Sequence, residues 1–209
     1  MNNFNSFPTF SKQILVLELN ASHQEMISGH LLKLSIEDRL LRFGMYASDN
    51  FINNYVDSLN FSRDAFFGVF DQSLNIIGLA HLAYPDHNFP SITAEFGVSV
   101  SERGRDMGIG TALFKRAAMH CRNTDIEILY VHCLSSNEAM MHIAEKAGMR
   151  VENVGGETDA YLRLSPGDKN SILSEALQDQ VATVDYSLKQ SFHRAVKLAS
   201  SLYKLPRLN

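Results

Sequence analysis

Two adjoining segments contain the residues whose types and spacing could do chemistry: AEFGVSV at 94–100 and SERGRDMGIG at 101–110. Alternation in the first segment predicts a strand with Glu95, Gly97 and Ser99 on one face and apolar side chains on the other. A strand that is followed by a helix is usually covered on both faces. The polar face therefore indicates a cleft beside this strand.

The second segment is a glycine-rich loop before a predicted helix that begins near Gly108. Glycine lets backbone amides approach an anion, the first turn of a helix offers unpaired N–H groups, and Arg103 and Arg105 add positive charge. These features suit a phosphate, although a flexible loop capped by a helix would look the same. A Walker loop needs a lysine before Thr111, and a Rossmann fingerprint needs GxGxxG where this loop has GxxxGxG, so both are excluded.

The stretch RDMGIG, Arg105 to Gly110, matches the signature Q/R-x-x-G-x-G/A that lies between the fourth strand and third helix of the GNAT acetyltransferase superfamily. The chain resembles this family over roughly residues 14–164, including NEAMMHIAEKAGM at 137–149. The resemblance implies that acetyl-CoA is the acyl donor, with its pantetheine arm on the strand and its pyrophosphate in the loop. The cofactor-binding residues that it implies are Val98, Ser99, Val100, Arg103, Arg105, Asp106, Met107, Gly108, Ile109, Gly110, Thr111 and Asn137.

Glu95 is the catalytic residue that the resemblance implies. The strand is similar to the AEFxVxV strand of bacterial protein acetyltransferases, in which the glutamate is the general base. A base is needed because an ordinary ammonium group, with a pKa of about 10, must lose a proton before it attacks a thioester. The alternative is a solvated or hydrogen-bonded strand carboxylate.

Three residues qualify the resemblance. Many family members have a tyrosine that protonates the departing thiolate seven residues after the motif asparagine, and here that residue is Ala144. Water could serve instead, or one of Ser135, Cys133 and His132; we expect His132 to be a core residue and leave it outside the catalytic set. Asp106 opposes a pyrophosphate unless it turns outward or pairs with an arginine. Asn137 could equally be an ordinary residue at a helix start.

Periodicity predicts the elements that position these residues, an α/β (α+β) fold with a mixed, mostly antiparallel sheet flanked by helices. The strand at 91–100, the helix from 108 and the strand at 127–134 form a β-α-β unit with parallel strands. Capping boxes are expected at Ser35 and Ser135, and a C-cap at Gly148. The other expected strands are 14–19, 65–70, 75–84, 151–154 and 160–164, and the other helices are 21–34, a stretch from 35, and 50–59. The expected domains are a loose N-terminus at 1–13, a GNAT-like acyl-CoA-binding domain at 14–165 and an amphipathic helical extension at 166–209.

In the extension, apolar residues recur at three- and four-residue steps, which predicts one long amphipathic helix or two with a break. Two interpretations stay open, namely that the stripe packs across the domain's own surface or that residues 171–204 form a homodimer. The stripe comprises Leu173, Leu177, Val181, Val184, Leu188, Phe192, Ala195, Ala199 and Leu202.

Composition narrows the function classes. The 209 residues are 45% hydrophobic and 20% charged, which is enough for one sizeable core. A net charge of −4 without a Lys/Arg run argues against a nucleic-acid partner, and no apolar run approaches the ~20 residues of a membrane span. Two cysteines without a signal-like N-terminus predict the cytoplasm, and no zinc-type spacing is present, so no metal is expected.

Together these observations predict an acetyl-CoA-dependent N-acetyltransferase that acts by direct attack, with Glu95 as general base. The acceptor is an amine-bearing small molecule or a protein lysine, with a slight lean to cationic acceptors from the acidic composition. The alternative is a non-catalytic CoA or acyl-CoA sensor, or an interaction module of the same fold, for which Ala144 is the motivating observation.

Overall fold

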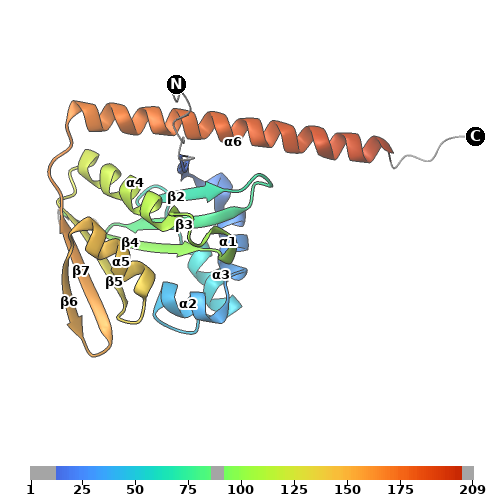
Figure 1. Ribbon diagram of the computed structural model, residues 1–209. Coiled ribbons are helices and arrows are strands. Elements are labelled where there is room, and N and C mark those ends of the chain that lie inside the picture. Colours follow the sequence, from blue (N-terminus) through green and yellow to red (C-terminus); the bar gives the residue numbers. More distant parts are fainter. Residues whose placement is uncertain (1–12, 86–91, 204–209) are drawn as a thin grey trace, which may run out of the picture.

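The computed structural model describes residues 13–85 and 92–203 (Figure 1). The N-terminal segment 1–13, apart from residue 13, and most of the 85–90 loop lie outside the described residues. The helices are η1 (Ala21–His23), α1 (Gln24–Leu32), α2 (Ile36–Phe43), α3 (Asp49–Asp57), η2 (Glu102–Gly104), α4 (Ile109–Asn123), α5 (Glu138–Ala147) and α6 (Lys169–Tyr203). The strands are β1 (Leu17–Leu19), β2 (Ala65–Phe70), β3 (Ile76–Ala83), β4 (Thr93–Val100), β5 (Ile128–Leu134), β6 (Arg150–Val154) and β7 (Glu157–Arg163).

These strands form a mixed sheet of seven in the order β1-β2-β3-β4-β5-β7-β6. Every neighbouring pair is antiparallel except β4 and β5, so the predicted mixed, mostly antiparallel sheet and its parallel β-α-β unit are confirmed. Helices α1 to α3 cover one face of the sheet, and α4 and α5 cover the other. Each face has its own apolar core, in which Phe66 and Phe67 of β2 point to opposite sides.

The two central strands separate part-way along their length. Their parallel pairing covers only Thr93 with Ile128, Ala94 with Leu129, and Glu95 with Tyr130. Beyond that point β4 continues to Val100 beside β3, and β5 continues to Leu134 beside β7. The inner edges of β4 and β5 therefore carry backbone groups without a strand partner, and such groups need hydrogen bonds from elsewhere.

The helix ends lie near the predicted residues, but the described residues form neither predicted capping box. Ser35 caps α2 from one side only, because the Asp38 carboxylate pairs with Arg105. Ser35 and Ser48 accept hydrogen bonds from the first turns of α2 and α3, and Gly148 ends α5 in the left-handed region at φ 69°. The prediction of a capping box at Ser135 was wrong, because the N-cap of α5 is Asn137, whose side chain accepts from the Met140 N–H at 3.0 Å. Ser135 instead exchanges a 2.8 Å hydrogen bond with the Thr158 hydroxyl.

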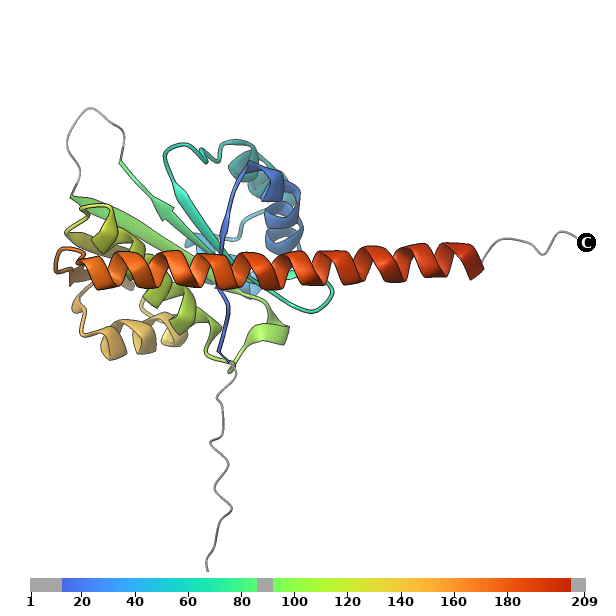
Figure 2. The same ribbon diagram turned by 90° about the horizontal axis from the view of Figure 1, so that it is seen from above.

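Helix α6 is one continuous helix of 35 residues that crosses the domain and extends past it (Figures 1 and 2). Part of its contact with the domain is polar. The Arg116 guanidinium of α4, only 1% exposed, binds Glu175 and lies 2.6 Å from the Asp179 carboxylate. Glu175 also accepts hydrogen bonds from His120 and Asn123.

The apolar stripe of α6 faces solvent, so the interpretation that it packs across the domain's own surface was wrong. Residues 175, 179, 182 and 186 face the domain, and the stripe at 177, 181, 184 and 188 is offset from them by two residues, or about half a turn. The most exposed apolar side chains of the stripe are Leu173, Leu177, Val181, Val184, Leu188 and Phe192, each at least half exposed. The α6 attachment thus combines the Arg116 ion pairs with an apolar contact of Ala182 and Tyr186, and the stripe takes no part in either.

Replacing Glu175 with Gln tests this attachment. Burial raises the pKa of Glu175, but hydrogen bonds from His120, Asn123 and Arg116 outweigh it and lower the pKa from 4.5 to about 2. Because the folded-state pKa is depressed, the resulting stability is present above pH 4.5 and is lost as the pH falls toward 2. We expect the variant to lose on the order of 2 kcal/mol at pH 7 and to show a flatter decline in urea-unfolding free energy below pH 5.

The matched control is Glu145→Gln, which removes an exposed carboxylate from α5. Its unfolding free energy should follow the wild-type pH dependence. Equal pH slopes for the Glu175 and Glu145 variants would contradict the charge-based attachment.

Candidate functional site

The glycine-rich loop leads directly into α4. Gly104 is tightly packed, since a Cβ there would lie 3.0 Å from the Ile77 carbonyl oxygen. Gly108 is the N-cap of α4 at φ 78°, a left-handed conformation that favours glycine. Among the residues described, no side chain caps this helix. The first N–H groups of α4 consequently point out of the helix without a side-chain acceptor, as an anion-binding helix start requires.

The charged residues of the loop are arranged less simply than expected. Arg105 forms an ion pair with Asp38 of α2, with Nη2 to carboxylate distances of 2.5 and 2.7 Å. Arg103 is exposed, and Asp106 adopts a left-handed conformation at φ 59°. Arg105 thereby links the loop to α2, and its charge is partly neutralised where a phosphate would bind.

A pocket of about 560 Å³ continues from the loop along α4. It lies between α4, α5 and the start of α6, and it reaches Thr111 in the first turn of α4, directly after the loop. Lys115, Arg122 and Lys146 supply positive charge to its lining. The sequence did not predict a basic pocket here, because these residues are spread along two helices and form no motif.

The polar face of β4 is present as predicted, but its members differ in accessibility. Glu95 is exposed and lies opposite Tyr130 at the last paired position before the strands separate. Ser99 is buried, and its hydroxyl donates to Nε2 of His30 at 2.9 Å, while Nδ1–H of His30 donates to the Ile76 carbonyl. The Ser99 side chain is thus already hydrogen-bonded, whereas Glu95 is open to solvent.

The residues considered as sources of a proton are placed as follows. His132 is 42% exposed, so the expectation of a core residue was wrong; it lies 2.8 Å from Asp159 of β7. Tyr130 donates to the same carboxylate at 2.6 Å, and burial together with that bond raises its pKa. Burial likewise raises the pKa of Cys133, which faces the core on the other side of the sheet. Ala144 is buried in that core.

A chain of hydrogen bonds lies on the face of the sheet that α1 to α3 cover, and it was not predicted from the sequence. Arg42 of α2 donates to the Tyr55 hydroxyl at 3.0 Å, and Tyr55 is 2.7 Å from Nδ1 of His81 on β3. Nε2 of His81 is 3.2 Å from buried Asp64. His81 pairs with Gly97 in the sheet, which places this chain directly beside β4. Its members are up to 39 positions apart along the chain and share no spacing signal.

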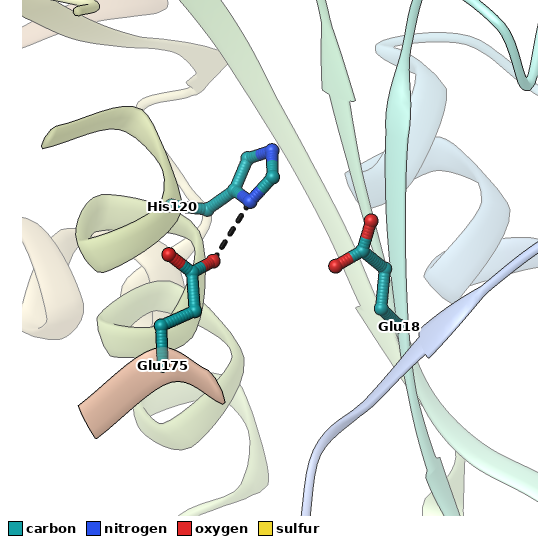
Figure 3. A group of neighbouring side chains, drawn as sticks. All are labelled: Glu18, His120 and Glu175. Atoms are coloured by element: carbon teal, nitrogen blue, oxygen red, sulfur yellow. Dashed lines mark hydrogen bonds and ion pairs between the residues drawn. The ribbon is translucent and has the colours of Figure 1, made fainter. Parts of the chain in front are cut away.

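One group of His and carboxylate side chains could be mistaken for a metal site. Glu18, His120 and Glu175 bring their ligand atoms within 4.8 Å of one another (Figure 3). The Arg116 guanidinium binds Glu175 and lies 3.4 Å from Glu18. A cation would have to displace this buried guanidinium, so the group fits an ion-pair cluster better than a metal site.

The model of the acetyltransferase (GNAT) family matches residues 31–149, which include the separating strands, the loop and α5. The chain belongs to the GNAT family. Its fold and family are those of acetyl-CoA-dependent acetyltransferases. No curated protein matches the chain significantly in sequence.

Solved GNAT structures share this fold at low sequence identity. The GNAT domain of S. lividans PAT is 15% identical with a TM-score of 0.61, and the match covers 76% of this chain and all of that chain. Spermidine N-acetyltransferase from Vibrio cholerae, in complex with CoA and spermine, is 19% identical with a TM-score of 0.56, covering 72% and 95%. The smu.2055 protein from Streptococcus mutans is 22% identical with a TM-score of 0.54, covering 72% and 99%. Among the described residues, no helix of this GNAT protein is long and apolar enough to cross a membrane.

The His30 contact, which holds β4 through Ser99, makes stability depend on pH. Burial lowers the pKa of His30 from 6.5 to about 4, so the folded protein disfavours the protonated ring. The contribution of the neutral His30 ring to the unfolding free energy is therefore fully present above pH 6.5, and it is lost as the pH falls from 6.5 to 4. We expect His30 to account for about 2 kcal/mol of lost unfolding free energy between pH 7 and pH 5.

A His30→Asn variant should lack this component of the pH dependence, although it starts from a lower stability because two buried hydrogen bonds are changed. The control His142→Asn alters an exposed histidine on α5 and should keep the wild-type slope. Urea titrations at pH 7, 6 and 5 measure the difference, and an unchanged slope in the His30 variant would contradict the assignment.

Proposed function

We propose that the protein transfers an acetyl group from acetyl-CoA to a primary amine, with Glu95 as general base. The observation that carries this is the position of Glu95. It is an exposed carboxylate at the last paired residue of β4, where the two central strands separate. A carboxylate there would meet an acceptor that approaches from the side of α1 to α3.

The acyl donor is proposed to lie between the separated strands. The β4 backbone around Val98 and Val100 would pair with the pantetheine arm, and the loop from Arg103 to Thr111 would hold the pyrophosphate at the uncapped start of α4. The basic pocket beside α4 suits the remaining phosphate of CoA. The V. cholerae spermidine acetyltransferase with bound CoA has the same fold, which supports this placement.

The side-chain amide of Asn137, a proposed cofactor residue, already has hydrogen-bond partners within the protein. Its side-chain oxygen caps α5, and its amide nitrogen lies 3.5 Å from the Leu41 carbonyl. These contacts give it a structural role, and a cofactor contact would have to form beside them. We keep Asn137 at the edge of the proposed donor site for that reason.

In the proposed reaction the acceptor amine loses a proton to Glu95, directly or through water, and its nitrogen attacks the thioester carbonyl carbon. A β4 backbone N–H near Val98 donates to the oxygen that becomes negatively charged. The carbon–sulfur bond then breaks, and the attacking nitrogen gives up its second proton to water to become the amide. The thiolate takes a proton from water, because Ala144 has no proton to donate. The step requires no metal.

The second candidate function is an acyl-CoA sensor of the same fold. The buried Ala144, in place of a hydroxyl-bearing side chain, is the observation that favours it. The sensor and the enzyme share the donor site and differ in turnover. A measurement of CoA release against CoA binding therefore separates them.

The decisive experiment is a CoA-release screen over amines, amino acids and lysine peptides. We expect Glu95→Gln to lower kcat/KM about 10²- to 10⁴-fold, the range for loss of a general base, and to leave acetyl-CoA binding by calorimetry intact. Glu127→Gln, which changes an exposed carboxylate just before β5, is the matched control and should retain activity. Binding of acetyl-CoA without release of CoA from any acceptor would support the sensor instead.

We further propose that α6 pairs with α6 of a second copy through its exposed apolar stripe. The exposed stripe lies opposite the face that contacts the domain, so no other part of the described chain covers it (Figure 1). The stripe spans a helix about 52 Å long.

Charges placed in the stripe test this pairing. We expect the wild type to sediment at twice the monomer mass and V184E/L188E to sediment as a monomer, because two carboxylates would be buried between the helices. The control A176E/T183E adds the same charge to exposed positions beside the stripe and should stay dimeric. A monomeric wild type at tens of micromolar would overturn the proposal.

A further inference from the structure

We propose that Arg42 binds a carboxylate of the acceptor, so that the preferred substrate carries both an amine and a carboxylate, as an amino acid does. This inference rests on the proposed acetyl transfer and specifies its acceptor. Arg42 lies near the end of α2, on the face of the sheet from which the acceptor would approach Glu95.

The guanidinium of Arg42 lies directly against β4. A Cβ added at Gly97 would be 2.7 Å from Cζ of Arg42, so only glycine leaves room for this contact. Glu95 and Gly97 are two residues apart and share a face of the strand. The cation and the proposed base are therefore neighbours, separated by about 7 Å along the strand.

Arg42 differs from four other arginines of the described chain, which each form an ion pair with a carboxylate. Its Nη2 donates to the Tyr55 hydroxyl, but its buried Nε finds no acceptor in the part of the chain that the structure describes. Within residues 13–85 and 92–203, no carboxylate lies within ion-pair distance of this guanidinium. Each of the following arginines does have such a carboxylate: Arg39, Arg63, Arg105 and Arg116.

The side chains that the structure shows in contact with the Arg42 guanidinium, those of Tyr55 and Phe43, are uncharged. Burial and the nearby guanidinium lower the pKa of His81, so that imidazole is neutral. Asp64 is bound by both Arg63 and His81 and does not contact Arg42. The rings of Phe43 and Tyr55 lie 4.9 and 5.7 Å from Cζ and hold the guanidinium in place. A half-buried cation without an anion is unfavourable, and an anionic ligand would offset that cost.

The chemistry of the guanidinium selects a carboxylate. Its planar array of N–H groups matches the two oxygens of a carboxylate in a paired hydrogen bond. An acceptor of this kind would place its carboxylate at Arg42 and its amine at Glu95, and the two protein charges would complement a zwitterion. A polyamine or an unmodified lysine side chain would meet the Arg42 cation with no anion of its own.

The test compares acceptors that differ only in the carboxylate. CoA release is measured for a panel of α-, β- and γ-amino acids, for their carboxamides and for the matching decarboxylated amines. We expect the wild-type kcat/KM to favour the amino acids by about 10- to 100-fold, as expected for a charged hydrogen bond. Phosphonate analogues form a further arm, and we expect them to be poorer than the carboxylates.

Substitution of Arg42 gives the second half of the test. Arg42→Gln should lower kcat/KM for the amino acids by about the same factor, chiefly through KM, and should leave the amides unchanged. Arg42→Lys should recover part of the preference because it restores the charge without the planar array. The control Arg150→Gln removes an exposed guanidinium from β6 and should change neither class.

Several outcomes would overturn the inference. They are equal activity on amides and amino acids, a preference for polyamines or lysine peptides, and an equal loss on both classes in a folded Arg42→Gln protein. If no acceptor releases CoA, acetyl transfer itself fails. Calorimetric binding of amino acids and amides to the CoA-loaded wild type and Arg42→Gln proteins then still decides the role of Arg42.

Discussion

The separation of β4 from β5 after the Glu95–Tyr130 pair is the constraint on which the rest of the site depends. Each strand stays in the sheet because its outer edge remains fully paired, β4 with β3 and β5 with β7. The separation therefore removes only the inner hydrogen bonds, and apolar packing on both faces holds the strands in their divergent directions. Unpaired backbone groups in such a gap are costly unless a ligand satisfies them, which is why the gap suits the amide-bearing arm of CoA.

The sequence predicted those parts of the site that depend on local backbone geometry. Arg105 to Gly110 carried its own signal, because a left-handed Gly108 at an uncapped helix start requires particular residues at particular spacings. Alternation likewise identified the polar face of β4. Both features are encoded by neighbours along the chain.

What the sequence could not predict depends on contacts between distant segments. Arg42, Tyr55 and His81 come from α2, α3 and β3 and meet only in the folded sheet. His132 looked like a core residue because its neighbours are apolar, yet its face of β5 is the accessible one. The two interpretations of the α6 stripe stayed open for the same reason. Periodicity shows that one face of α6 is apolar, but not which face contacts the domain. Here the domain contacts the opposite face, where Arg116 binds Glu175.

The relative size of two proton transfers explains why Glu95 matters more to the proposed reaction than the missing hydroxyl at Ala144. An alkyl ammonium with a pKa near 10.4 must give up its proton at pH 7, which costs about 4 to 5 kcal/mol. A thiolate whose conjugate acid has a pKa near 8.5 gains only about 2 kcal/mol from protonation at the same pH. A site that lacks an acid but keeps a well-placed base therefore forgoes the smaller contribution. Ala144 is compatible with turnover, whereas loss of Glu95 would remove the larger one.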